Sequence, residues 1–458
     1  MTAEPTESTV PTEPTDSTGK TPARPTAPAR PTAPARPTAP ARPTAPARPT
    51  ARSAAAGRGR RPRAVVVGGG IGGLTAAVAL HLRGWHVTVL ERAAELKPVG
   101  SGISLAPNAQ RALDVIGLGD EIRSLAAWEG EGGLRTSSGR WLSRSDAKAA
   151  AERFGGSLVL LHRATLIDKL ASRLPHGAVR TASAAALADP GVAGDPARPA
   201  RVTTPEGACE AELVVGADGI RSAVRTALFP VHPGAVYAGF TTWRLLVPPL
   251  GRPFAQHETW GRGRIWGTHP FADGTVYAYG AAVAPAGEQT PDGEKAELLR
   301  RFGDWHDPIP AIIGAAAPDE ILRHDVHHIA EPLPAFHRGR IALLGDAAHA
   351  MPPTLGQGGN QAIEDAVVLA HHADPEHPDA LGLAAYTAAR RPRTTAIARK
   401  AVGVGRVNLL RNRPAMALRN TLIAALDKTG PAVMLRGFDE IADWRPPQRP
   451  YAAQTRRA

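Results

Sequence analysis

The chain has 458 residues, 43% of them hydrophobic, so it can bury a core large enough for one composite globular unit or two domains. Its formal net charge of +12 would suit a nucleic acid or an anionic membrane, but residues 1–63 carry +7 of that charge, so neither is the expected partner. A single cysteine, Cys209, excludes an intrachain disulfide and any multi-cysteine metal site.

Residues 1–61 are predicted to form a disordered, basic, proline-rich tail. Within it, residues 23–50 repeat the hexapeptide ARPTAP four times and begin a fifth copy, which places a proline at every third position. This period matches the polyproline II helix, which has no internal hydrogen bonds and buries no core. A semi-rigid extension is expected, with binding to an acidic partner or an SH3-like groove as the alternative. No apolar run approaches the length of a membrane span and no apolar signal core opens the chain, so a cytoplasmic protein without a membrane span is expected.

A nucleotide-binding βαβ unit is predicted directly after the tail. The β-branched run at 63–67 indicates a buried strand, and the sequence GGGIGG, a helical segment and a second strand ending at Glu91 follow it. Gly68 permits the tight turn, Gly70 lets a pyrophosphate approach the backbone, and Gly73 lets the helix pack closely on the strand. Glu91 can accept a hydrogen bond from a ribose hydroxyl. The unit predicts a dinucleotide site but does not choose between NAD and FAD.

Four later segments narrow that choice. They are the loop and helix SGISLAPNAQRALDVIGL at 101–118, the strand and helix LVLLHRATLIDKL at 158–170, the buried strand and turn LVVGADGIRSAVR at 213–225, and IALLGDAAHAMPPTLGQGGNQAIEDAVVLA at 341–370.

Taken together, these motifs resemble the single-component FAD-dependent aromatic hydroxylases, the p-hydroxybenzoate hydroxylase-like superfamily, nearest its salicylate hydroxylase, urate hydroxylase and zeaxanthin epoxidase branches. The resemblance covers residues 62–400 and rests on three ordered motifs, GxGxxG, GADG and GDAAH followed by PP and a glycine pair. It implies an α/β fold with a Rossmann-like FAD-binding domain of the glutathione reductase type, an inserted antiparallel-sheet substrate domain and C-terminal helices. The implied boundaries are 62–230 and 335–400 for the two parts of the FAD-binding domain, 231–334 for the substrate domain, and 401–458 for a helical region and tail.

The segment at 344–359 is where the flavin is expected. Asp346 follows a buried strand, at the sheet edge where α/β folds bind ligands, and the resemblance assigns it to a ribityl hydroxyl. Pro352 and Pro353 form a rigid wall that in similar enzymes lies beside the reactive flavin edge, so Pro353 is predicted in the catalytic site. A helix beginning at Asn360 or Gln361 directs its positive end at the ring. The residues expected against the isoalloxazine are Gly356, Gln357, Gly358, Gly359 and Asn360.

The resemblance implies further cofactor contacts. For Arg163 the alternative is a surface arginine, and for Asp218 it is a turn-stabilising carboxylate. His349 is expected to pack rather than act as a base, and no metal is predicted at the adjacent His327 and His328 because they face opposite sides of a strand. The implied cofactor contacts are Gly72 and Gly73 at the pyrophosphate, Arg92 near the adenosine, Ser104 in a loop touching the cofactor, Arg163 at the ribityl phosphate, Asp218 near FAD and the NAD(P)H path, and Ala184 beside the adenine.

Successive strands with turn signals between them are predicted over residues 235–285, the substrate sheet of the family. Strand alternation separates Trp243 from Arg244, so both cannot face one cavity. Arg244 is a candidate for binding an anionic or phenolate substrate, and a solvent-facing or salt-bridged arginine is the alternative. Trp266, Tyr277 and Tyr279 are candidate wall residues.

The function implied by the resemblance is that of a FAD-dependent, NAD(P)H-consuming monooxygenase. It hydroxylates or epoxidises a small aromatic, heteroaromatic or unsaturated substrate through a flavin hydroperoxide formed with molecular oxygen. Only one dinucleotide fingerprint is present, so NAD(P)H is expected to bind transiently. The alternatives are a flavin oxidase, dehydrogenase or reductase on the same scaffold and, from another class, a flavin-bearing nucleic-acid-binding or scaffold protein acting through its tail. The residues name neither the substrate nor a general base.

Overall fold

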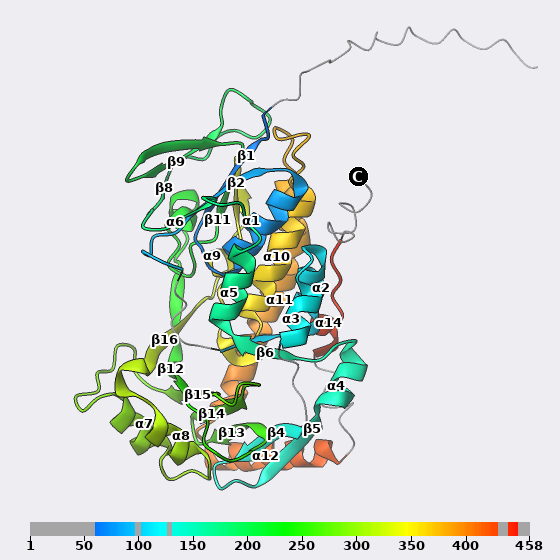
Figure 1. The fold of residues 1–458 in the computed structure, drawn as a ribbon. Coiled ribbons are helices and arrows are strands. Elements are labelled where there is room, and N and C mark those ends of the chain that lie inside the picture. The colour runs from blue at the N-terminus through cyan, green and yellow to red at the C-terminus, as the bar shows by residue number, and fades with distance from the viewer. Residues whose placement is uncertain (1–59, 97–101, 126–130, 429–437, 448–458) are drawn as a thin grey trace, which may run out of the picture. The chain divides into compact units, whose positions relative to one another are not determined.

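The computed structural model describes residues 60–96, 102–125, 131–428 and 438–447. The tail predicted for residues 1–61 lies outside the described residues, apart from Arg60 and Arg61. Two larger sheets carry the described fold, and helices lie against both of them (Figure 1). This mixed α/β architecture confirms the predicted fold class.

The first sheet is Rossmann-like, with the strand order β17-β18-β11-β1-β2-β7. Neighbouring strands run parallel except for the edge pair β17 and β18. Its central strands are short, almost fully buried runs of apolar residues, as expected for a parallel sheet covered by helices. The strands are β1 (Arg63–Val67), β2 (His86–Leu90), β7 (Val179–Arg180), β11 (Leu213–Gly216), β17 (His337–Arg338) and β18 (Ile341–Leu343).

The helices of this part begin close to the ends of its strands. β1 leads through the glycine loop into α1, which packs against α10, and β18 leads into the short α9. The sheet edge that α9 and α10 follow is therefore the edge where ligands bind in such folds. The helices are α1 (Ile71–Arg83), α2 (Pro107–Val115), α3 (Gly119–Leu125), α5 (Arg163–Ala171), α6 (Ala223–Leu228), α9 (Asp346–His349) and α10 (Gly358–His372).

The second sheet has the order β16-β12-β15-β14-β13-β4-β5. It confirms the strands predicted over 235–285, but it also contains residues 131–146, which the sequence had placed in the FAD-binding part, and β4 pairs with β13 in parallel. One face packs its tryptophans against α7 and α8. The elements are β4 (Glu131–Thr136), β5 (Trp141–Asp146), β12 (Ala235–Val247), β13 (Gln256–Gly261), β14 (Arg264–Pro270), β15 (Val276–Val283), β16 (Leu322–Ile329), α7 (Glu294–Phe302) and α8 (Ile309–Ala315).

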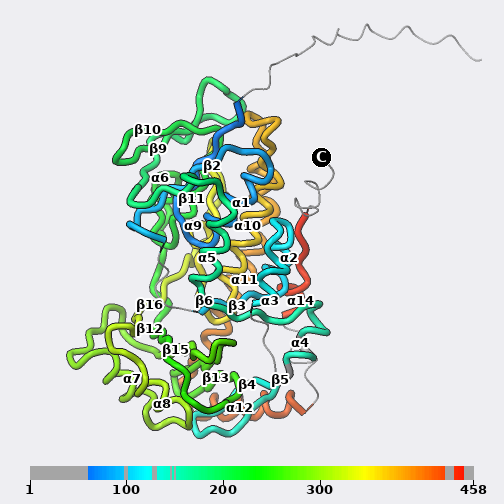
Figure 2. The backbone as a smooth tube through the Cα atoms, viewed as in Figure 1, coloured from blue at the N-terminus to red at the C-terminus, as the bar shows by residue number. Residues whose placement is uncertain are grey.

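The long helix α11 (Leu383–Asn408) packs along α10 and continues toward the level of the second sheet (Figure 2). The predicted boundary between residues 400 and 401 falls inside this helix, and the rest of the domain division stays a prediction. The remaining elements are β3 (Gly102–Leu105), β6 (Val159–His162), β8 (Ala186–Asp189), β9 (Ala200–Thr204), β10 (Gly207–Ala211), α4 (Ala147–Phe154), α12 (Arg413–Asp427), α14 (Asp439–Ala442) and the 3-10 turns η1 (Pro318–Glu320) and η2 (Pro353–Leu355).

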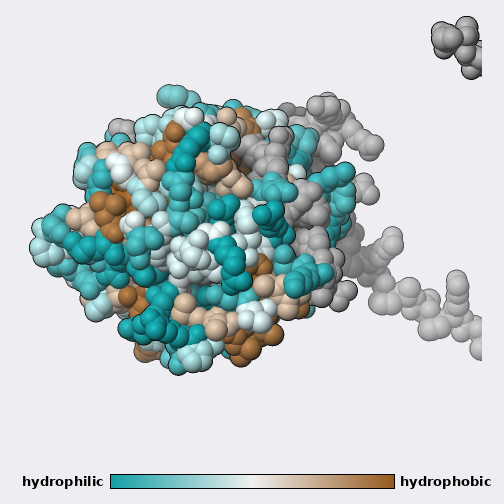
Figure 3. All heavy atoms as spheres, turned by 90° about the horizontal axis from the view of Figure 1, so that it is seen from below, coloured by the Kyte–Doolittle hydropathy of each residue, from teal (hydrophilic) through white to brown (hydrophobic). Residues whose placement is uncertain are grey.

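The surface below the second sheet is mixed in character. Seen from this side, hydrophobic residues form separate spots among hydrophilic ones (Figure 3). Three exposed leucines, Leu418, Leu422 and Leu426, follow one another along α12 at helical spacing. No helix among the described residues has the length and apolar character needed to cross a bilayer.

Candidate active site

The glycine loop between β1 and α1 has three different uses for its glycines. Gly68 takes a φ of +110°, and a β-carbon there would collide with the carbonyl of Ala217. A β-carbon on Gly73 would collide with the carbonyl of Gly68, so this glycine lets α1 press against the turn. Gly70, at the N-cap of α1, instead faces open space. The loop therefore leaves a cradle at the positive end of α1 that a side chain on Gly70 would fill. The α-carbon of Gly72 faces Leu344 and Ala362, so only its backbone N–H is directed by the helix toward this cradle.

Glu91 lies beside this cradle. Its carboxylate accepts hydrogen bonds from the backbone N–H groups of Gly69 (2.6 Å) and Ala93 (2.9 Å), so it holds the glycine loop in place. The backbone carbonyl of Glu91 accepts from Ser183 N–H at 2.8 Å, which brings the neighbouring Ala184 to the same end of the sheet. Ala184 lies between β7 and β8 rather than on a strand, and both it and Arg92 are exposed.

Asp346 begins α9 after Gly345, whose backbone takes the left-handed φ of +57°. The carboxyl group is exposed, yet surrounding protein desolvates it enough to raise its pKa, while the charges of His349 and Arg163 lower that pKa. Solvent thus reaches Asp346 although the surrounding protein disfavours its charged form. The structure places this carboxyl group just after the carboxyl end of β18.

The helix α10 begins at Gly358, two or three residues before the predicted start, with Gln357 as its N-cap residue. Asn360 points into the protein instead of outward. Its amide accepts from Ala106 N–H at 2.9 Å and donates to the carbonyls of Ser104 (3.0 Å) and Gly356 (2.7 Å). Asn360 therefore pins the start of α10 to β3, and Ser104 contributes a carbonyl to this clamp.

The glycines around the start of α10 leave room on its outer side. A β-carbon on Gly358 would meet nothing closer than the Asp346 carboxylate, 3.8 Å away, and Gly356 takes a left-handed φ of +62° with open space around its α-carbon. Gly359 is tighter, because its β-carbon would lie 3.1 Å from Ile103. The free N–H groups of the first helical turn thus face the same space as Asp346.

Arg163 and Arg244 approach that space from two other elements. Arg163 is the first residue of α5 and makes no hydrogen bond to another described residue. Desolvation lowers its pKa, and the ionisable groups near enough to affect that pKa are Asp346, Arg244 and Tyr277. Arg244 lies on β12, where its Nη2 contacts His324 Nδ1 at 3.1 Å while its buried Nε has no hydrogen-bond partner. The structure brings together Arg163, Arg244, Asp346 and Tyr277, which are far apart in the sequence.

The comparisons with known proteins bear on what such a site holds. A family model described as FAD binding domain matches residues 62–242 and 284–401, more than half of the chain. The chain belongs to the FAD-dependent aromatic hydroxylase superfamily. Its cofactor is FAD, and it is an enzyme of the FAD-dependent monooxygenase class.

Similar proteins cover most of the chain. An aurachin C monooxygenase/isomerase from Stigmatella aurantiaca is 36% identical over 78% of this chain and 93% of the relative. A 3-amino-4-hydroxybenzoate 2-monooxygenase from Streptomyces cremeus is 36% identical over 74% of this chain and 86% of the relative. The crystal structure of Klebsiella pneumoniae HpxO complexed with FAD and uric acid superimposes with a TM-score of 0.75 at 28% identity, covering 83% of this chain and 96% of that one.

Several features of this enzyme fit FAD. The cradle at Gly70 and the free N–H groups of α1 suit a pyrophosphate, and the desolvated Asp346 suits a hydroxyl-bearing chain. Arg163 has no hydrogen-bonded partner of its own in the described part of the chain. The individual contacts predicted from the sequence stay predictions.

Asp218 has a partner within its own turn. Its carboxylate accepts from Ser222 Oγ at 2.5 Å and from Val224 N–H at 3.1 Å, so it caps the start of α6. This geometry favours the alternative in which Asp218 stabilises its own turn over the one in which it contacts the cofactor. The following Arg225 donates to the carbonyl of Ala347 at 3.1 Å and thereby ties the GADG turn to α9.

Pro353 is exposed and opens η2, whereas Pro352 is buried. The next residue, Thr354, donates from its hydroxyl to the carbonyl of Ala401 at 2.6 Å, and the α-carbon of Gly405 faces its methyl group. The proline segment is therefore fastened to α11, which holds the exposed Pro353 in a fixed position relative to that helix.

A buried ionic network between α10 and α11 was not predicted from the sequence. Arg390 of α11 pairs with Glu364 (2.5 Å) and Asp365 (2.6 Å), and Asp365 also accepts from Gly345 N–H (2.9 Å) and contacts His349 Nε2 (2.5 Å). Despite its burial, the charges of His349 and Arg390 hold the pKa of Asp365 below its usual range. The only signal in the sequence was a pair of acids inside the apolar run AIEDAVVLA.

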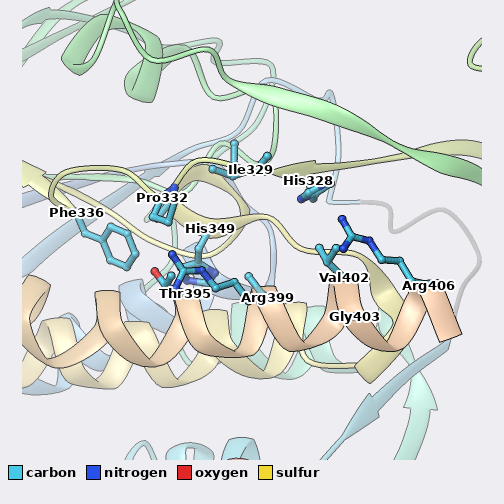
Figure 4. Close-up of a pocket in the computed structure, with 13 residues that line it drawn as sticks. His328, Ile329, Pro332, Phe336, His349, Thr395, Arg399, Val402, Gly403 and Arg406 are labelled. Carbon is cyan, nitrogen blue, oxygen red and sulfur yellow. The ribbon is translucent and has the colours of Figure 1, made fainter.

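His349 contacts Asp365, and it also borders a cavity of about 360 Å³ on the α11 side of α9. His328 and Phe336 line this cavity opposite Arg399 and Arg406 of α11 (Figure 4). The Nδ1 atom of His349 is buried without a hydrogen-bond partner.

Proposed function

We propose that this enzyme uses NAD(P)H and molecular oxygen to oxygenate a small aromatic or heteroaromatic ring. The observation that carries the proposal is the convergence of Arg163, Asp346, Arg244 and Tyr277 on one space between the two sheets. That space has the helix start of α10 on one side and an aromatic sheet face on the other. The relatives named above carry out monooxygenation of aromatic compounds according to their names, which supports the same reaction class here.

The chain's own residues bind and orient in this proposal, because FAD supplies the redox and oxygen-activating chemistry when bound. Gly70 and the N-terminus of α1 hold the pyrophosphate, and Asp346 accepts from a ribityl hydroxyl. The N–H groups at the start of α10 stabilise negative charge on the reduced ring system.

The remaining residues handle the substrate. Arg244 directs a buried, unpaired Nε–H toward an anionic or carbonyl group of the ring. Arg163 balances the charge of Asp346. Pro353 walls the site, so that water is kept from the reacting atoms. NAD(P)H binds transiently, because the described fold has one dinucleotide-binding βαβ unit.

The test combines FAD occupancy with turnover. We expect the wild-type protein to carry FAD and to oxidise NAD(P)H faster with an aromatic ligand present, with oxygenated products identified by mass spectrometry across an aromatic panel. Asp346→Ala should raise the dissociation constant for FAD at least tenfold. Asp346→Asn, which keeps an accepting oxygen, should bind FAD more tightly than Asp346→Ala does. Full FAD occupancy in Asp346→Ala would contradict the role of Asp346.

A further inference from the structure

Four residues form a line across the second sheet on the face opposite α7 and α8. Arg244 pairs with Tyr279, Tyr279 with Gly267, and Gly267 with Glu258, in neighbouring strands β12, β15, β14 and β13. Directly opposed residues present their side chains on the same face of a sheet. We call this set, Arg244, Tyr279, Gly267 and Glu258, the Arg244–Glu258 row. Its two ends lie three strand spacings apart, roughly 14 Å.

Gly267 sets the position of the ring in the middle of the row. A β-carbon on Gly267 would collide with the ring of Tyr279, so the phenol lies over the glycine backbone. This position carries the Tyr279 hydroxyl to Glu258, with which it interacts as a hydrogen-bonding partner. A larger residue at 267 would push the ring off the row.

Glu258 is a carboxyl group without a charged partner. Trp260 Nε1–H donates to its Oε1 at 2.8 Å and fixes its orientation, and no ion pair joins it to any lysine, arginine or histidine in the described part of the chain. The side chain is only half-buried, but surrounding protein desolvates it and raises its pKa. Solvent thus still reaches a carboxyl group whose charged form the surrounding protein disfavours.

Aromatic rings cover the sheet next to the row. His269 stacks on Tyr279 (5.6 Å, 20°) and on Tyr277 (6.1 Å, 27°), and Tyr277 is parallel to Phe271 (6.2 Å, 3°). Tyr277 and Phe271 also cover Gly102 of β3, so this surface reaches the FAD-binding part of the fold. Tyr277 and Tyr279 are themselves tilted by 45°. An aromatic surface is therefore bordered by a positive group at one end and a carboxyl group at the other.

We propose that Glu258 is a specificity-determining residue that selects, with Arg244, a ring bearing an acceptor or anionic group at one end and an N–H or O–H donor at the other. The inference rests on the proposed function, since it assigns the substrate class of the same site. The roughly 14 Å between the two strand positions is of the order spanned by one aromatic ring together with the side chains that bind a substituent at each of its ends. A second anionic group would meet the unpaired carboxyl of Glu258 and be rejected.

Three probe ligands test this without any turnover. Benzoate has the anionic group alone, 4-aminobenzoate adds a donor at the opposite end, and terephthalate places a second carboxylate there. Binding is measured near neutral pH on the oxidised, FAD-loaded protein through the change in flavin absorbance. In the wild type we expect 4-aminobenzoate to bind about tenfold more tightly than benzoate. We expect terephthalate to bind at least tenfold more weakly than benzoate.

Glu258→Gln keeps the size of the side chain and an oxygen for Trp260, but removes the charge. It should bind terephthalate at least tenfold more tightly than the wild type does, and its affinity for benzoate should be unchanged. The control variant Glu320→Gln, at an exposed position of η1, should change neither affinity. Tyr279→Phe keeps the ring over Gly267 and the charge of Glu258, so it should still reject terephthalate.

An unchanged ratio of terephthalate to benzoate affinity in Glu258→Gln would overturn the proposal. So would acceptance of terephthalate by Tyr279→Phe, or failure of every probe to perturb the wild-type flavin. Because the assay uses neither NAD(P)H nor oxygen, a finding that the enzyme is an oxidase would leave its outcome standing. Conversely, a loss of ligand discrimination would leave monooxygenation standing.

Discussion

At the scale of single residues, the glycine loop separates positions that serve packing from one that is open and is proposed to serve the ligand. Gly68 and Gly73 face backbone atoms of their own fold, whereas Gly70 faces open space at the N-terminus of α1. The structure agrees with the roles predicted for Gly68 in the turn and Gly73 in helix packing, and the role of Gly70 at a phosphate stays a prediction.

This contrast predicts different outcomes for two alanine variants. Gly73→Ala should destabilise the folded protein by more than 2 kcal/mol, because its β-carbon meets the carbonyl of Gly68 and the backbone must shift. Gly70→Ala should leave the urea-unfolding midpoint of the apoprotein nearly unchanged and lower FAD affinity at least tenfold. Normal FAD binding by folded Gly70→Ala protein would show that the cradle does not hold the pyrophosphate.

The hydrogen-bond partners of single polar side chains were harder to predict than the backbone conformation of the glycines. Asp218 and Asn360 are predicted at the cofactor, a prediction that stays open, and their side chains also bond to Ser222 and Val224 in one case and to Ala106 and Ser104 in the other. A short polar side chain next to a helix start finds backbone partners as readily as a ligand, and sequence spacing does not distinguish the two outcomes.

At the scale of elements, the buried network joining α10 and α11 fixes the turn that carries Asp346. Arg390 enters from α11, and Asp365 of α10 passes the constraint to Gly345 and His349. Sequence reasoning missed it because Arg390 lies 25 residues beyond Asp365 and only the packing of the two helices brings them together. The strands β4 and β5 were missed for the same reason, since they join the second sheet across a long sequence separation.

Arg390→Met should destabilise the enzyme by about 3–5 kcal/mol, because the buried Asp365 would lose its arginine partner and the buried Glu364 would keep only Arg393. Urea unfolding at neutral pH measures the loss. The pKa of Asp365 is held below its ordinary value in the folded state, so its contribution is present above that ordinary value and is lost as the pH falls toward the folded-state pKa. Asp365→Asn should therefore make stability less sensitive to acid, and an unaltered acid dependence would contradict the pairing.

The segment that contains Pro352 and Pro353 leads to a prediction about how well turnover is coupled to oxygenation. Pro353→Gly should keep FAD, because η2 stays fastened to α11 through Thr354, but it should loosen the wall. We expect more hydrogen peroxide released per NAD(P)H oxidised, measured with a peroxidase-coupled assay in the presence of a substrate. Thr354→Val, which removes the anchoring hydroxyl, should act in the same direction, and unchanged coupling in both variants would mean that this wall does not border the reacting atoms.

At the scale of the whole molecule, the site is assembled from parts of the chain that the sequence separates by as many as 288 residues, from Gly70 to Gly358. Strand runs, the glycine motif and the turn GADG identified the Rossmann-like part, since each is a local pattern with one structural solution. The face of the second sheet that carries Arg244 and Glu258 could not be predicted, because alternation fixes which residues share a face but not which face the helices cover.

Removal of residues 1–59 tests how far the enzyme depends on its tail. That stretch has no core-forming pattern in its sequence, so the truncated protein should keep its FAD content, unfolding midpoint and turnover. Insoluble or flavin-free protein after truncation would show instead that the tail is required for the fold.

The most direct test of the account is turnover under isotopically labelled molecular oxygen. The FAD-loaded protein is given NAD(P)H and each ring compound that accelerates NAD(P)H oxidation, and the products are analysed by mass spectrometry. We expect one labelled oxygen atom to enter the ring for each NAD(P)H consumed in coupled turnover, and we expect Arg244→Met to lower this incorporation while the protein retains FAD. An oxidised product without label, with hydrogen peroxide formed in equal amount, would contradict oxygenation at this site and identify the enzyme as an oxidase.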